Sequence, residues 1–135
     1  MPPANLVTNG DFSSDATWIW GNEWTYNGVD NDADADAGGG SNPLEQDIGT
    51  LAGVYYLVAY WIKATDGTII PYIGANAGTG ESGVGRYFDV ILCSNDGDNL
   101  KFVQAGPFAQ TTIDDVYAYA LYDGAGPKAG GRLAR

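Results

Sequence analysis

The stretch Val54-Tyr-Tyr-Leu-Val-Ala-Tyr-Trp-Ile-Lys63 decides the fold class, because both of its alternating sets of side chains are apolar. In an extended strand the two sets point to opposite sides. One set is Tyr56, Val58, Tyr60 and Ile62, and the other is Tyr55, Leu57, Ala59 and Trp61. A run of this kind predicts a strand covered on both faces, inside a β-sandwich or at an interface.

The segments around this strand predict more strands and no helix. Thr65-Asp-Gly67 reads as a turn, and Ile69–Gly74 returns as the partner strand of a hairpin. Further strands are expected at about residues 18–26, 87–93, 100–103 and 114–122, and the glycine-rich residues 74–85 are expected to form a surface loop. No stretch has sustained helical periodicity. The sequence therefore predicts a single all-β domain, an antiparallel β-sandwich of the jelly-roll type.

Composition limits the classes of function. The 135 residues carry 17 acidic and six basic side chains, a net charge of −11, so a nucleic-acid backbone would be repelled. No apolar run approaches the roughly 20 residues of a membrane span, and residues 1–4 do not resemble a signal peptide, so we expect folding in a cytoplasm. There is no histidine, and the single cysteine, Cys93, lies in an apolar run without an activating group. We therefore expect a protein that is not an enzyme.

Charge is divided unevenly between a body and a C-terminal arm. Residues 1–123 hold all 17 acids and three bases, a net charge of −14, whereas residues 124–135 hold three bases, a net charge of +3. The glycine-rich composition of residues 124–135 predicts a flexible basic arm on a domain of residues 1–123. Its bases are Lys128, Arg132 and Arg135. Either it is a disordered tail, or it docks on an acidic neighbour.

Residues 29–37 alternate aspartate with small residues over most of their length. An EF-hand calcium loop is excluded, because Ala35 stands where glycine is needed and Ser41 where a bidentate glutamate belongs. In a strand the alanines would point inward and the acids outward. The outward acids would be Asp30, Asp32, Asp34 and Asp36. Such a row is a solvated face that resists aggregation, a binding surface for a basic arm, or a weak divalent-cation site.

Four aromatic residues form a candidate glycan-stacking set: Trp18, Trp20, Trp24 and Tyr26. Their even spacing places all four on one face of a strand if no bulge intervenes. Sugar rings stack on exposed aromatic rings, because their C–H bonds meet the negative π-face. The alternative is that these rings belong to the core or to a subunit interface.

The two ends of the domain carry a family resemblance. Asn5-Leu-Val-Thr-Asn-Gly-Asp-Phe12 and Thr112-Ile-Asp-Asp-Val-Tyr117 resemble the first and last strands of jelly rolls of the carbohydrate-binding-module and galactose-binding-like type. Relatives of this type occur in tail and head proteins of tailed bacteriophages. The resemblance implies that the two ends lie close together. It also implies an optional structural calcium at Asp11, Asp114 and Asp115, although Ser13 replaces a glutamate that often contributes.

The resemblance, with the missing catalytic residues, leads to a functional expectation and two alternatives. We expect an accessory structural protein of a phage virion, made in the host cytoplasm and acting as a head decoration or cement protein on the capsid protein. Because copies of charge −14 repel one another, a homo-oligomer would have to bury apolar surface, and a trimer is expected. The first alternative is a carbohydrate-binding module or phage receptor-binding piece that recognises glycans through Trp and Tyr. The second is a fragment of a secreted glycoside hydrolase.

Overall fold

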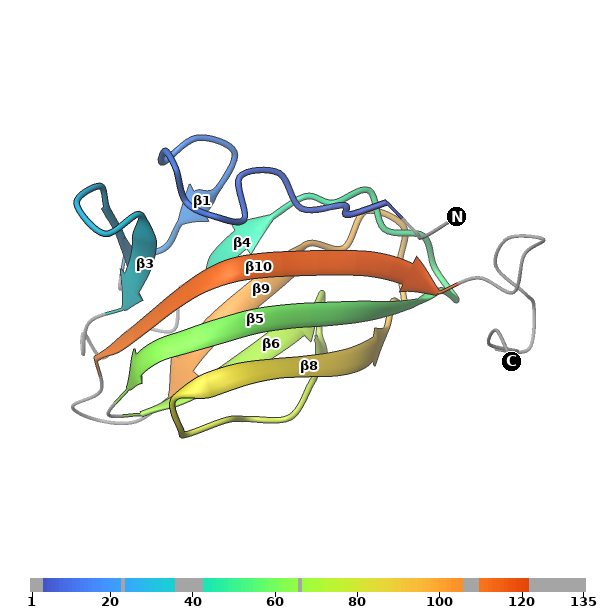
Figure 1. Cartoon of the computed structure of the whole chain (residues 1–135). Helices are drawn as coiled ribbons and strands as arrows, with labels where there is room; N and C mark the ends of the chain where they lie inside the picture. Colours follow the sequence, from blue (N-terminus) through green and yellow to red (C-terminus); the bar gives the residue numbers. More distant parts are fainter. Residues whose placement is uncertain (1–3, 23, 36–42, 66, 106–109, 122–135) are drawn as a thin grey trace.

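The computed structural model describes residues 4–22, 24–35, 43–65, 67–105 and 110–121. Within them the chain forms ten β-strands and no helix, so no helix is present that could cross a membrane. The strands build two five-stranded sheets that pack face to face (Figure 1). Every strand pair is antiparallel, which confirms the predicted antiparallel β-sandwich.

Sheet order follows the jelly-roll pattern, in which strands that neighbour one another in sequence often lie in different sheets. The strands are β1 Ile19–Trp20, β2 Trp24–Asn27, β3 Asp32–Ala35, β4 Leu44–Gln46, β5 Tyr55–Thr65, β6 Thr68–Ile73, β7 Asn76–Ala77, β8 Gly85–Leu92, β9 Leu100–Ala105 and β10 Thr111–Leu121. The first sheet has the order β1-β4-β9-β6-β7, and the second has the order β2-β3-β10-β5-β8. The long strands β10, β5 and β8 lie side by side across the front of the molecule in Figure 1.

The alternation in β5 divides its side chains between the core and the outside. The inward set from Tyr56 to Ile62 is buried. It meets side chains of the opposite sheet, as where the ring of Tyr60 lies 5.2 Å from that of Phe102. The outward set is only half-buried. The prediction that both faces of this strand are covered is therefore wrong for a single copy of the chain. Nothing in the first sheet reaches that side.

The N-terminal segment lies along β10, as the resemblance implied. The amide of Leu6 donates to the carbonyl of Ala118 at 2.8 Å, and that of Val116 donates to Gly10 at 3.0 Å. The expected strand at the C-terminal end is β10, but residues 5–12 are not a regular strand, which corrects the expectation of a strand there. Asn9 and Phe12 have positive φ angles of 55° and 50°, which interrupt an extended ladder.

β5 and β6 do not form the predicted hairpin, because the two strands belong to different sheets. Two boundaries also differ from the sequence prediction. The single strand expected at residues 18–26 is two strands, because the chain turns after Trp20 and enters the other sheet at Trp24. The expected loop at residues 74–85 contains β7 and a bridge between Ile69 and Glu81. In both places short tertiary pairings decide the structure, and local composition does not reveal them.

Candidate functional site

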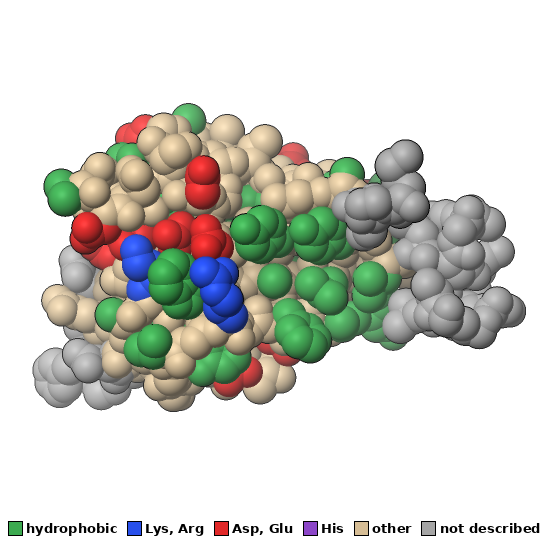
Figure 2. All heavy atoms as spheres, viewed as in Figure 1, with side chains coloured by type: hydrophobic (Ala, Val, Ile, Leu, Met, Phe, Trp, Pro, Cys, Tyr) green, Lys and Arg blue, Asp and Glu red, His purple; other side chains and the backbone are tan. Residues whose placement is uncertain are grey.

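The outward side of β10, β5 and β8 is an apolar surface, which we call the outer face. Its residues are Tyr55, Leu57, Ala59, Trp61, Phe88, Val90, Leu92, Tyr117, Tyr119 and Leu121. Strand pairing places them in three rows across the sheet. The first row is Leu121, Tyr55 and Leu92, the second is Tyr119, Leu57 and Val90, and the third is Tyr117, Ala59 and Phe88. Figure 2 shows these side chains gathered over the three strands, with basic and acidic groups at one end.

The row of Tyr117, Ala59 and Phe88 is the most exposed aromatic part of this surface. Phe88 is 69% exposed and Tyr117 is 39% exposed. The small side chain of Ala59 lies between them on the central strand. Two accessible aromatic rings are therefore held on the two strands that flank β5 in one sheet, with the small side chain of Ala59 between them.

A β-bulge in β10 decides which of its residues reach the outer face. Asp114 pairs with Trp61, whereas Tyr117 pairs with Ala59, so β10 has one more residue than β5 between these pairs. Asp115 takes a left-handed conformation, with a φ angle of 49°, at this point. The extra residue reverses the alternation, so that Val116 is buried and Tyr117 is exposed.

Charged groups surround Trp61 at one end of the outer face. The guanidinium carbon of Arg86 lies 4.5 Å from the centroid of the indole ring, and the ammonium of Lys63 lies 5.3 Å from it. Arg86 also pairs with Asp115 at 3.1 Å. Lys63 and Arg86 are two of the three basic residues in residues 1–123, and three acids, Asp32, Asp114 and Asp115, pair with them.

Lys63 forms ion pairs with two buried acids. Its ammonium lies 2.9 Å from Asp32 and 3.7 Å from Asp114. Burial raises the pKa of the Asp32 carboxyl above its ordinary value of 3.8, although the hydrogen bond from Lys63 opposes this shift. Burial also raises the pKa of Asp114. The hydrogen bond to Asp32 raises the pKa of Lys63, so the lysine stays charged while the two acids share it.

The acidic row does not form the solvated face that its sequence predicts. Ala33 and Ala35 are buried as expected, but Asp32 is only 2% exposed and is bound by Lys63. Asp34 accepts hydrogen bonds from Asn27 and Thr112. Asp30 is exposed, and Asp36 lies outside the described residues. Asp32 lies close to β5 and β10, where strand pairing brings Lys63 next to it.

The predicted stacking set is separated by the structure. Trp18 and Trp24 are buried in the core, at 6% and 4% exposure, so their ring faces are covered. Trp20 and Tyr26 are half-buried and pack against each other, with ring centroids 6.0 Å apart. The four residues do not share one strand face, because β1 and β2 belong to different sheets. The accessible rings of the outer face were missed, although the alternation of β8 over residues 86–92 was a signal for them.

The three carboxylates suggested for calcium lie in different settings. Asp114 is close to Lys63, and Asp115 pairs with Arg86. Asp11 is exposed in the N-terminal segment, where it accepts a hydrogen bond from the amide of Ser13. Among the described residues, no three acidic or cysteine side chains form a group that could hold a metal ion. Calcium stays an implication of the family resemblance. The arm bases Lys128, Arg132 and Arg135 lie outside the described residues.

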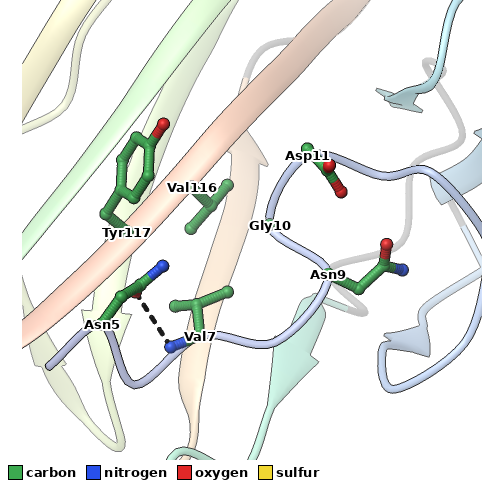
Figure 3. Close-up of a pocket in the computed structure, with 7 residues that line it drawn as sticks. All are labelled: Asn5, Val7, Asn9, Gly10, Asp11, Val116 and Tyr117. Carbon is green, nitrogen blue, oxygen red and sulfur yellow. Dashed lines mark hydrogen bonds between the residues drawn. The ribbon is translucent and has the colours of Figure 1, made fainter.

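A hollow of about 300 Å³ adjoins the outer face between the N-terminal segment and β10. Figure 3 shows its lining residues, Asn5, Val7, Asn9, Gly10, Asp11, Val116 and Tyr117. Tyr117 belongs to both surfaces. The hollow therefore adjoins the outer face at Tyr117.

Solved structures of similar fold include carbohydrate-binding modules. A variant of a carbohydrate binding module of family 29 has a TM-score of 0.59 and 12% identity, over 88% of this chain and 91% of that one. Another variant of such a module, complexed with cellulohexaose, has a TM-score of 0.58 and 12% identity, over 88% and 90% of the two chains. The enzymatically active domain of tailspike protein 4 from bacteriophage CBA120 has a TM-score of 0.56 and 19% identity, over 87% of this chain but only 21% of that one.

This likeness extends to the fold. No family model matches the sequence, and no curated protein matches it. At identities below 20%, the neighbours show that the chain has the β-sandwich of carbohydrate-binding modules. The fold does not determine the function, because one fold carries many functions; the residues of the outer face do.

Proposed function

We propose that this chain is a non-catalytic carbohydrate-binding domain that holds a neutral glycan on its outer face. The observation that carries the proposal is the row of Tyr117, Ala59 and Phe88, which presents two accessible aromatic rings on one sheet. The fold neighbours support this function more than a role in capsid decoration. The absence of histidine supports a binding role rather than catalysis.

The spacing of the row suits a chain of sugar rings. Tyr117 and Phe88 stand on strands on either side of β5, so their Cα atoms are roughly 10 Å apart. Ala59 leaves room between the two rings. A sugar can stack its C–H bonds against one aromatic ring while a neighbouring sugar meets the other.

The charged end of the outer face supplies hydrogen-bonding groups. Arg86 has a side chain that is 62% exposed, and it can donate to sugar hydroxyls, while Asp115 can accept from them. These groups include three acids, Asp32, Asp114 and Asp115, against two bases. An anionic glycan would be repelled by this balance and by the acidic body, so a neutral glycan fits best.

The test is calorimetric titration of the purified chain with a panel of neutral and anionic oligosaccharides, starting from cellohexaose. We expect binding of a neutral glycan, and loss of at least about 1.4 kcal/mol of binding free energy, or tenfold in Kd, in Phe88→Ala and in Tyr117→Ala. Tyr72→Ala is the matched control, since Tyr72 is a half-buried tyrosine on the outward side of β6 in the other sheet.

The two variants and the control must share the melting temperature of the wild type within a few degrees for this comparison. Equal binding by wild type, Phe88→Ala and Tyr117→Ala would remove the outer face from the proposal. Failure of the wild type to bind any member of the panel would remove the glycan function altogether.

A virion structural role remains the second candidate, because the far end of the outer face is largely aliphatic. The rows containing Leu121 with Leu92, and Leu57 with Val90, have no charged neighbour in register and would suit a protein surface. This candidate predicts an oligomer or particle-bound form that Leu92→Asp disrupts. Sedimentation of wild type and variant decides it, and a monomer that binds no particle would exclude it.

A further inference from the structure

The N-terminal segment borders β10 on the edge that faces away from β5. The amide of Leu6 donates to the carbonyl of Ala118 at 2.8 Å, and the amide of Val116 donates to the carbonyl of Gly10 at 3.0 Å. Tyr117 stands between these two attachment points on β10. At the level of Tyr117, the segment therefore has the position that a further strand would have in the sheet.

The hollow continues the aromatic row in the same direction. Phe88, Ala59 and Tyr117 are in register across β8, β5 and β10. The hollow lies at the next position, between Tyr117 and the N-terminal segment, and Figure 3 shows its lining residues on these two parts of the chain. A glycan that lies across the row and extends beyond Tyr117 therefore reaches the hollow.

The walls of the hollow combine apolar and polar groups. Val7 and Val116 are buried, whereas Asn5 and Asp11 are exposed, so the base of the hollow is apolar and its rim is polar. A sugar ring has apolar C–H faces and an edge of hydroxyl groups, which matches this division. At about 300 Å³ the hollow has the volume of the smallest ligand pockets, so it takes a single sugar ring.

Two hydrogen-bonding groups in the hollow are available to a ligand. Asn5 accepts from the amides of Val7 and Ala118 with its side-chain oxygen, which fixes the side chain and leaves its amide nitrogen as a free donor among the described residues. One carboxylate oxygen of Asp11 accepts from the amide of Ser13, and the other has no hydrogen bond within the described part of the chain. Because a hydroxyl both donates and accepts, a sugar can use both groups, whereas the carboxylate disfavours an anionic sugar.

The spacing of the strands sets the length of the bound chain. Neighbouring strands lie roughly 5 Å apart, and one sugar residue of an extended glycan is about as long. The line from Phe88 to Tyr117 covers two strand spacings, and the N-terminal segment adds one more. About three sugars therefore cover the row, and one further sugar enters the hollow.

We propose that the hollow is an end subsite, which binds the sugar that follows the row in a neutral, extended glycan running across the strands. This inference rests on the proposed function and deepens it, because it names the ligand as an extended chain of at least about four sugars. Tyr117 contacts the glycan at the boundary, since it belongs both to the row and to the hollow.

The test compares the trisaccharide and the tetrasaccharide of each neutral series that binds, beginning with cello- and manno-oligosaccharides. Calorimetric titration of the wild type should show about tenfold tighter binding of the tetrasaccharide, because only the longer chain fills both the row and the hollow. Asp11→Leu places a bulky apolar side chain at the rim and removes the acceptor, so the tetrasaccharide should bind it no more tightly than the trisaccharide. The affinity for the trisaccharide, which lies on the row alone, should stay that of the wild type.

Two further variants separate the end subsite from general damage. Asp11→Asn keeps a hydrogen-bonding side chain of the same size and should retain most of the preference for the tetrasaccharide. Asp15→Leu changes another exposed acid of the N-terminal segment that does not line the hollow, and should behave as the wild type.

A second measurement needs no variant. In NMR spectra of the wild type, the tetrasaccharide should shift the amide signals of Gly10 and Asp11 together with that of Ala59 in the row. A tetrasaccharide that shifts the signal of Ala59 and leaves those of Gly10 and Asp11 in place would overturn the end subsite.

The outcomes distinguish this inference from the function on which it rests. Equal affinity of the wild type for the two chain lengths, with binding still lost in Phe88→Ala, overturns the end subsite and leaves the outer-face function standing. A preference for the tetrasaccharide that survives in Asp11→Leu also overturns the end subsite. Failure of the wild type to bind either length of any neutral series removes both proposals.

Discussion

Tyr117 faces Ala59 across the ladder between β10 and β5, and it does so only because a bulge centred on Asp115 adds one residue to β10. Without that residue the alternation would place Val116 outside and Tyr117 in the core. The aromatic row of the outer face therefore depends on one backbone irregularity. Its left-handed conformation is tolerated by aspartate and asparagine better than by other non-glycine residues.

The first prediction concerns this conformation. Asp115→Val should destabilise the fold by about 1–2 kcal/mol relative to Asp115→Asn, because a β-branched residue is strained at a positive φ angle. Both variants remove the charge that pairs with Arg86, so their difference reflects mainly the backbone strain at this residue. Urea unfolding of the two variants measures it. Equal stability would show that β10 reaches the outer face without strain at this residue.

The second prediction concerns the attachment of the N-terminal segment to β10. A side chain at Gly10 would overlap the carbonyl oxygen of Val116, so Gly10→Ala should cost about 2 kcal/mol. It should also speed hydrogen exchange of the Val116 amide, whose acceptor is Gly10. Gly83→Ala is the control, because its nearest neighbour is the end of the Tyr87 side chain. A Gly10→Ala protein as stable as this control would contradict the close approach.

Strand content could be predicted from sequence where the pattern of apolar residues was strong, as in β5. The inward set of β5 is buried as its spacing indicates, and the contact between the domain ends follows the expected pairing. Alternation gives two faces to a strand but does not say which face another layer covers. For this reason the same pattern that predicted β5 also predicted a covered outer face, which the structure leaves accessible.

The candidate site was less predictable, because it depends on contacts between distant residues. Trp18 and Trp24 have the same spacing as exposed stacking residues, yet both are buried in the core, and β1 and β2 belong to different sheets. The sequence predicts that Asp32 is solvated, but strand pairing places Lys63 beside it. Local composition does not indicate the bulge at Asp115, so the outward position of Tyr117 could not be inferred from the sequence.

The third prediction concerns pH, and it follows from the raised pKa of Asp32. Since the folded pKa lies above the unfolded value near 3.8, the stability contributed by Asp32 is fully present below that pH and is lost as pH rises through the folded pKa. In Asp32→Asn this loss is absent, while the amide oxygen still accepts from Lys63. The variant should therefore become more stable relative to wild type as pH rises from acidic to neutral.

Urea unfolding of wild type and Asp32→Asn at several pH values between about 3.5 and 7 measures this gain. Asp15→Asn, at an exposed acid of the N-terminal segment, should follow the wild type throughout. A difference between Asp32→Asn and wild type that shrinks as pH rises would mean that the ion pair with Lys63 outweighs the cost of burial.

The fourth prediction tests the role of Arg86 in ligand binding and follows from its place over Trp61. Arg86→Ala should change stability by less than about 1 kcal/mol, because its pair with Asp115 is exposed to solvent. It should weaken binding of a neutral glycan several-fold, since it removes planar donors beside Trp61 at the charged end of the outer face. Arg86→Lys should not restore affinity, because an ammonium lacks the planar fork that both stacks on Trp61 and donates in parallel. Calorimetry at low and high salt completes the test. If the ligand is neutral, its affinity should hardly change with salt. If salt markedly weakens binding to the wild type but not to Arg86→Ala, the ligand is anionic instead.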